Sequence, residues 1–113
     1  METNLSEPSR ISSTDSDGFR TLQRTIAENY PGIVVAPGLS MVATDSRHYA
    51  PIASDIYRFL PLRVTADDLK RIHGVDERIG IKTYADLIGF LARLIENLSA
   101  PAAEGAPERP SVR

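Results

Sequence analysis

Apolar residues recur at three- and four-residue intervals in two stretches of the chain, and this spacing predicts two amphipathic helices. The first helix has Ser16 or Asp17 as its N-cap, and the Pro-Gly pair at 31–32 ends it. The second and longer helix is predicted to run from Thr83 to about Asn97. The periodic residues are Phe19, Leu22, Ile26 and Tyr30 in the first helix and Tyr84, Leu87, Ile88, Leu91, Leu94, Ile95 and Leu98 in the second. Each helix therefore has one face suited to burial.

Two shorter apolar runs predict β-strands. Residues 33–37, IVVAP, form a β-branched run without alternation, which is typical of a strand covered on both faces. Residues 55–62, DIYRFLPL, place aromatic and aliphatic side chains at alternate positions and predict a second strand. We therefore expect an α/β fold, a partial αβα layered sheet of two to three strands with flanking helices. So few strands do not make a complete sheet, and the chain resembles one part of a larger fold.

Short helices are predicted in the two polar stretches. One lies near 46–53, with Thr44 or Asp45 as its cap. Another begins at Thr65, where Thr-Ala-Asp-Asp resembles a capping box with Asp in place of Glu, and it continues to Arg71. No internal repeat is present.

Length and composition are compatible with one small domain. The chain has 113 residues, of which 42% are hydrophobic and 25% charged, as in ordinary globular proteins. Residues 1–16 are rich in polar residues and predict a flexible lead-in, whereas 99–113 predict a disordered Ala/Pro tail. The folded segment is expected over 17–98, and so small a segment has marginal stability or depends on a partner.

Charge and cysteine content narrow the possible partners. The 13 basic and 15 acidic residues are scattered, so nothing forms the basic patch that nucleic acid requires. No apolar run approaches the roughly 20 residues that cross a bilayer, and the N-terminus lacks the apolar core of a secretory signal. We therefore expect no nucleic-acid partner, no membrane span and a cytoplasmic location. Because the chain has no cysteine, a metal site here requires imidazole and carboxylate ligands.

Candidate chemistry lies in the polar stretches ATDSRHY (43–49) and IHGVDERIG (72–80), which connect predicted elements. Taken alone, these residues have ordinary structural explanations. His73 is then a solvated or hydrogen-bonded imidazole, and Asp45 with Arg47 is a helix cap beside a surface ion pair. The run from Asp76 to Arg78 is then a charged turn.

Three ordered motifs nevertheless resemble a known family. TDSRHY, then YRFLP, then IHGVDER before a long helix are similar to the end of the catalytic domain in the di-zinc metallopeptidase family of carboxypeptidase S, aminoacylase, glutamate carboxypeptidase and succinyl-diaminopimelate desuccinylase. The resemblance covers about positions 8–98 and is strongest to the carboxypeptidase S and N-acyl-amino-acid hydrolase branch. It departs from the family pattern at Asp76, where Asn is common.

The resemblance implies roles for individual residues. His73 matches the family's C-terminal zinc ligand, and Asp76 or Glu77 is expected to orient the imidazole through its second nitrogen. Thr44, Asp45 and Arg47 match a loop at the rim of the active site, where they support the substrate pocket. His48 matches no metal ligand. The implied cofactor is zinc, and the implied substrate of the complete enzyme is a peptide or an N-acyl amino acid.

Most of the family's active site has no counterpart in this sequence. The family's H-x-D motif, bridging Asp and Glu-Glu pair are absent, and so are the further acidic ligand and the inserted lid domain, although residues 1–16 resemble the lid-to-catalytic junction. We therefore expect a C-terminal segment of a zinc-dependent hydrolase, a truncated or split product that is inactive without its N-terminal half and has no catalytic residue of its own. The alternative is a small non-enzymatic binding or interaction module that retains part of the fold.

Overall fold

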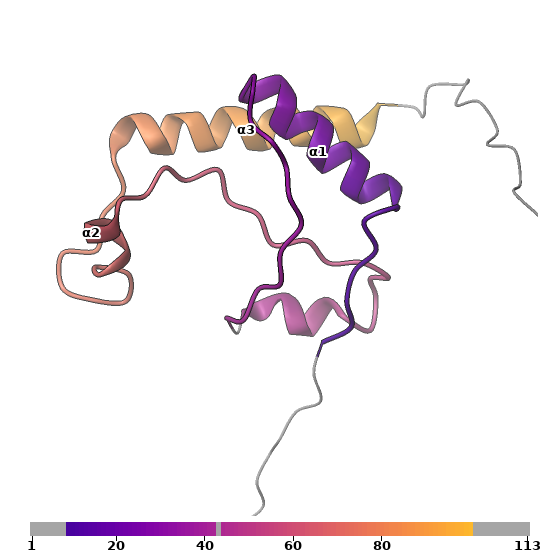
Figure 1. Ribbon diagram of the computed structural model, residues 1–113, viewed down its shortest axis with the longest axis horizontal. Coiled ribbons are helices and arrows are strands. Elements are labelled where there is room, and N and C mark those ends of the chain that lie inside the picture. Colours follow the sequence, from indigo (N-terminus) through magenta and orange to yellow (C-terminus); the bar gives the residue numbers. More distant parts are fainter. Residues whose placement is uncertain (1–8, 43, 101–113) are drawn as a thin grey trace, which may run out of the picture.

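Helices are the regular secondary structure of the residues that this computed structural model describes, which are 9–42 and 44–100. In chain order they are α1 (Asp17–Asn29), the 3₁₀ helix η1 (Asp45–Tyr49), α2 (Ala66–Leu69) and α3 (Ile81–Ser99) (Figure 1). Both long helices predicted from the apolar spacing are confirmed, and α3 extends two residues beyond its predicted range at each end. The two short helices also form at the predicted N-caps Thr44 and Thr65, but η1 ends at Tyr49 instead of near 53 and α2 ends at Leu69 instead of Arg71.

At the N-termini of α1, η1 and α2, side-chain oxygens satisfy backbone N–H groups that have no partner within the helix, whereas α3 follows Gly80 without a side-chain cap. Ser16 Oγ accepts a hydrogen bond from the backbone N–H of Phe19 at 3.1 Å and starts α1. At the other end, the Tyr30 N–H donates to the Ile26 carbonyl before Gly32 adopts a left-handed φ of 84°. A residue with a Cβ rarely adopts that conformation, so the Pro-Gly pair ends the helix.

A small core lies where α1 crosses α3. Ile26 is 3% exposed and Phe90 is 1% exposed, and these two are the fully buried large apolar side chains of the described residues. The Phe90 ring lies 5.4 Å from that of Phe59 and 6.3 Å from that of Tyr30, measured between centroids. Phe90 therefore joins both long helices to the segment that contains Phe59.

Polar side chains close the same helix pair at its edge. Asn97 Nδ2 on α3 donates to Thr25 Oγ1 at 2.9 Å and to Glu28 Oε2 at 3.0 Å. Arg93 Nε donates to the same Glu28 oxygen at 2.8 Å. The hydrogen bonds from Asn97 and Arg93 lower the pKa of Glu28 below its ordinary value, because both stabilise the carboxylate. These bonds fix the register of α1 against α3.

The predicted sheet is wrong for the described residues. Residues 33–37 and 55–62 run as irregular chain, and no backbone hydrogen bond of a strand ladder joins them to each other or to a third segment of the described chain; the Ile33 N–H bonds only to the Tyr30 carbonyl in the turn that follows α1. A strand exists only when a neighbour accepts and donates its ladder hydrogen bonds. In the second segment, moreover, the Leu62 N–H bonds to the Leu60 carbonyl at 2.8 Å in a tight turn around Pro61, which has no N–H to donate. Apolar patterning predicted the extended backbone but not the missing neighbours.

Side chains partly replace the ladder along the second extended segment. Ser12 Oγ accepts from the Ile56 N–H at 2.8 Å and donates to the Ile56 carbonyl at 2.9 Å. The Ser13 N–H donates to Asp55 Oδ1 at 2.7 Å, and the Tyr57 hydroxyl bonds to the Ser13 carbonyl. The part of the predicted lead-in that the structure describes therefore runs beside this segment; residues 1–8 of that lead-in, and the predicted tail from 101 onward, lie outside the described residues.

Much apolar surface of the chain remains in contact with solvent. The chain has a radius of gyration of 17.6 Å, whereas a compact domain of about 100 residues has roughly 13 Å. Val34, within the segment 33–37, is 88% exposed, and Met41, a few residues after it, is 99% exposed. On α3 an apolar row faces away from the core; its members are Ile81, Tyr84, Ile88, Leu91, Ile95 and Leu98. None of the helices within 9–42 and 44–100 is long and apolar enough to span a bilayer.

Candidate functional site

The loop that carries His73 follows a well-capped turn. Thr65 Oγ1 accepts from the Asp68 N–H at 3.2 Å, and Asp68 Oδ2 accepts from the Thr65 N–H at 2.9 Å, which confirms the predicted capping box. The backbone and side-chain hydrogen bonds from Thr65 lower the pKa of Asp68 below its ordinary value, with a smaller contribution from Arg71. Arg71 Nη1 also donates to Asp68 Oδ1 at 3.2 Å, so the chain entering the loop is held at several points.

Two of the predicted site residues have left-handed backbone conformations. His73 has a φ of 62° and Asp76 a φ of 65°, values uncommon outside glycine. Between them, Gly74 donates its N–H to the Arg71 carbonyl at 2.8 Å, and a Cβ on Gly74 would lie only 3.2 Å from that oxygen. The glycine thus permits the tight turn that places His73 at the surface, where its side chain is exposed.

The predicted partners of His73 do not contact it within the described chain. Asp76 and Glu77 are both exposed, and neither makes a hydrogen bond to the imidazole among the contacts of residues 9–42 and 44–100. The same residues contain no cluster of three or more His, Asp or Glu side chains suited to one metal ion. A zinc site needs about four ligands, so the side chains described here do not fit a zinc site by themselves. His73 is available as one ligand only.

The substrate-rim residues predicted from the sequence lie on η1. Thr44 is the N-cap, and its Oγ1 accepts from the Ser46 N–H at 3.2 Å and donates to Ser46 Oγ at 2.6 Å. Asp45 and Arg47 are exposed on this helix. Arg47 Nε donates to His48 Nε2 at 3.3 Å, so that nitrogen of His48 is an acceptor in this arrangement. No ion pair forms between Asp45 and Arg47 among the described residues.

Arg58 was not predicted as a site residue, yet it holds this turn. Its Nε donates to Ser46 Oγ at 2.8 Å, and its Nη1 donates to the carbonyl oxygens of Val42 at 3.0 Å and Ser40 at 3.4 Å. The sequence signal was a lone cation between two aromatic residues, Tyr57 and Phe59, in a segment predicted as a strand. The charged guanidinium is directed to η1 and the residues before it, where it finds oxygen acceptors.

The two candidate loops do not meet in this chain. Figure 1 shows η1 and the α2 loop at separate corners of the molecule, with the extended segments running between them. The rim residues Thr44, Asp45 and Arg47 therefore do not share a pocket with His73. A site that uses both groups therefore needs further parts of a larger fold to fill the space between them.

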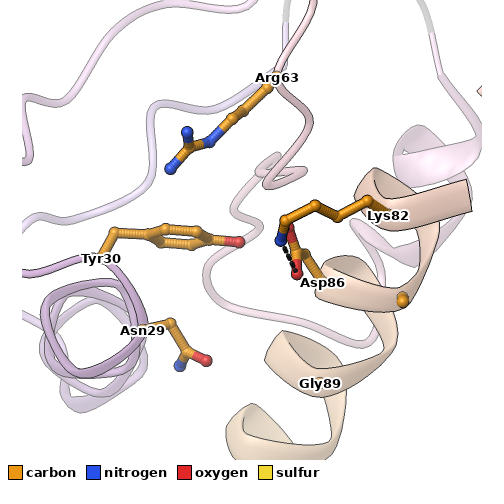
Figure 2. A pocket seen from close by; sticks show the side chains of 7 residues that line it. Asn29, Tyr30, Arg63, Lys82, Asp86 and Gly89 are labelled. Atoms are coloured by element: carbon orange, nitrogen blue, oxygen red, sulfur yellow. Dashed lines mark hydrogen bonds and ion pairs between the residues drawn. The ribbon is translucent and has the colours of Figure 1, made fainter. Parts of the chain in front are cut away.

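Two shallow hollows lie near Tyr30, and none of the predicted site residues lines either. The first, of about 340 Å³, has a polar lining in which Lys82 pairs with Asp86 at 2.9 Å while Tyr30 and Arg63 face the same space (Figure 2). The second, of about 290 Å³, is mainly apolar. It is bounded by Ile26 of α1, by its C-cap Tyr30 and by the two extended segments, over 33–36 and 59–63.

Sequence similarity to curated proteins identifies the family. A probable carboxypeptidase S-like protein of Dictyostelium discoideum is 45% identical over 94 residues, which cover 83% of this chain and 18% of that protein. The N-fatty-acyl-amino acid synthase/hydrolase of Mus musculus is 36% identical over 94 residues, covering 80% of this chain and 19% of that protein. The chain belongs to the family of carboxypeptidase S and the N-acyl-amino-acid hydrolases.

The family resemblance drawn from the three motifs is thus confirmed. Carboxypeptidase S of Saccharomyces cerevisiae is a more distant relative, 28% identical over 74 residues, or 66% of this chain and 13% of that protein. The chain spans about a fifth of the length of the first two relatives. No family model matches the sequence, and no solved structure matches it.

The structure also gives a physical reason for the departure at Asp76. The left-handed conformation at this position is tolerated best by Gly, which has no Cβ, and after it by Asn and Asp, which have short polar side chains. The Asn of the family pattern and the Asp of this chain both meet that requirement. The exchange therefore preserves the turn while it adds a negative charge three residues after His73.

Proposed function

We propose that this chain supplies the C-terminal segment of a zinc-dependent carboxypeptidase or N-acyl-amino-acid hydrolase and acts only together with the rest of that catalytic domain. The observation that supports it most is the 45% identity to a carboxypeptidase S-like protein over 83% of this chain but only 18% of the relative. The substrate class is a peptide or an N-acyl amino acid, as the names of the relatives suggest.

In this proposal His73 contributes one imidazole ligand, and Thr44, Asp45 and Arg47 contribute to the substrate rim. When bound, zinc would supply the polarisation and water activation that hydrolysis of an amide bond requires. The chain's own part is to present the imidazole from a tight turn and to present the rim side chains from η1. The remaining ligands and the group that removes a proton from water must come from the other part of the domain.

The exposed apolar surface supports dependence on that other part. The hollow between the C-terminal end of α1 and residues 33–36 and 59–63 is mainly apolar, and within the described chain the extended segments around it have backbone groups without a hydrogen-bond partner. Such groups are stabilised when neighbouring chain pairs with them. Burial of one large apolar side chain stabilises by about 1.5 to 3 kcal/mol, so covering several of them would exceed the stability of a small domain.

Co-expression tests the proposal. The chain is produced with the N-terminal catalytic segment and lid of a full-length carboxypeptidase S-like relative, and co-purification, zinc content and hydrolysis of N-acyl amino acids and dipeptides are measured. We expect zinc-dependent hydrolysis that requires both pieces and is lost in His73→Ala. His48→Ala is the matched control, since it removes the other histidine and should leave the zinc content unchanged.

Two results would count against the proposal. Equal loss of zinc in the His73 and His48 variants would show that neither side chain has a specific metal role. A chain that unfolds cooperatively as a monomer and does not associate with the N-terminal segment would favour the non-enzymatic binding module.

A further inference from the structure

Residues 40–42 and 44–49 have few tertiary hydrogen bonds within the described chain. Most of their bonds are local, as in the Thr44–Ser46 and Arg47–His48 pairs. Among the described residues, Arg58 donates three of the four hydrogen bonds that join η1, its C-cap and the chain before it to distant residues. The fourth runs from Arg10 Nη2 to the carbonyl of Ala50, the C-cap of η1, at 3.2 Å. The N-terminal end of η1, which carries the rim residues, is therefore held by Arg58.

The geometry of these bonds uses the shape of the guanidinium group. Nε is directed to the Ser46 hydroxyl and Nη1 to the Val42 carbonyl, so two different nitrogens of one planar group contact two different points of the loop. All these acceptors are neutral oxygens, so the contact is not an ion pair. A lysine offers one ammonium at the end of a flexible chain and does not reproduce a planar fork.

The Ser46 hydroxyl transmits this contact to the cap of η1. It accepts from Arg58 Nε at 2.8 Å and from Thr44 Oγ1 at 2.6 Å, which uses both acceptor positions of a hydroxyl. Ser46 is the half-buried residue of η1, whereas its neighbours Asp45 and Arg47 are exposed. In a 3₁₀ helix successive side chains differ by about 120°, so holding Ser46 toward Arg58 directs Asp45 and Arg47 away from the body of the chain.

We propose that Arg58 is a positioning residue that fixes the Thr44–Arg47 rim, so that Asp45 and Arg47 are in place before substrate arrives. This inference rests on the proposed function for the role of the rim, but the contact itself does not. Arg58 acts through Ser46 and is not expected to touch the reacting atoms. Its loss should therefore weaken substrate binding more than it slows the chemical step.

Amide hydrogen exchange of the 113-residue chain tests the contact. Because hydrogen bonds to charged donors are strong, Arg58→Lys and Arg58→Gln should each speed exchange of the Ser46 and Arg47 amides by about tenfold or more. Amides of α1 and α3 should be unchanged. Arg20→Lys, which alters an exposed arginine paired with Asp17 on α1, is the matched control and should leave the η1 amides unaffected.

Kinetics of the co-expressed pair then test the positioning role. We expect a raised KM for an N-acyl amino acid in both Arg58 variants, with a much smaller change in kcat. Unchanged η1 exchange, or exchange that rises equally in α1 and α3, would overturn the inference, and so would faster η1 exchange with an unchanged KM. If the wild-type pair hydrolyses nothing, the proposed function fails, while the exchange experiment still decides whether Arg58 holds η1.

Discussion

Replacement of Phe90 by alanine should remove most of the chain's own tertiary stability. Phe90 is 1% exposed and packs against the rings of Phe59 and Tyr30 at 5.4 and 6.3 Å. Truncation of a buried phenylalanine costs about 3–5 kcal/mol, and the lost aromatic pairs place the cost toward the upper end. The other fully buried large apolar side chain among the described residues is Ile26, so little remains to compensate.

The matched control lies on the opposite face of the same helix. Ile88 is 53% exposed, and Ile88→Ala removes a similar side chain from the outer apolar row of α3. In the isolated chain this change should cost less than about 1 kcal/mol, since exposed substitutions cost little and alanine favours helix. In the co-expressed pair the row is expected to be covered, so the same change should weaken association.

Thermal and urea unfolding followed by circular dichroism at the helix band would measure both variants. Each kcal/mol lowers the melting temperature of so small a domain by about 4–8 °C, so Phe90→Ala should lower it by roughly 15–30 °C and Ile88→Ala by a few degrees. Equal losses in the isolated chain would refute the assignment of the core to the inner face of α3. If Ile88→Ala associates with the N-terminal segment as strongly as the wild type does, the N-terminal segment does not cover the outer row.

Hydrogen bonds from Asn97 and Arg93 lower the pKa of Glu28, so the carboxylate's contribution to stability is complete above the ordinary pKa of 4.5 and is lost as pH falls through the lower pKa of the folded chain. Urea midpoints measured between pH 6 and pH 3 should therefore fall less in Glu28→Gln than in the wild type. Part of the fall that remains in the variant comes from Asp68, whose pKa is also lowered. Calorimetric titration of the isolated chain with zinc should give only weak binding that is reduced in His73→Ala, and tight stoichiometric binding would mean that a complete site exists. Asp76→Asn should leave the free energy of unfolding, measured in urea, within about 0.5 kcal/mol of the wild type. Asp76→Val should lower this free energy by about 1–3 kcal/mol because a β-branched residue is strained at a φ of 65°; equal stability of the two variants would contradict a required left-handed turn.

Local patterns in the sequence were sufficient for the helices and for the family. The positions of α1 and α3 follow from periodic apolar residues, and the ends of α1 follow from Ser16 and from the Pro-Gly pair at 31–32. The caps of η1 and α2 follow from Thr44 and Thr65. These features depend on residues within a few positions of one another, so the sequence alone predicts them. The motifs that carry the resemblance are equally local.

Features that depend on distant neighbours needed the tertiary structure. An apolar run at 33–37 predicts extended backbone, but only an adjacent strand makes it part of a sheet, and the described chain provides none. The polar closure of α1 on α3 by Asn97 joins residues about seventy positions apart, and the hold of Arg58 on η1 spans more than ten. Neither pair has a spacing that a helix or strand period would reveal. The separation of His73 from the rim residues likewise became clear only when the chain was placed in space, because proximity within a site is a property of the whole fold.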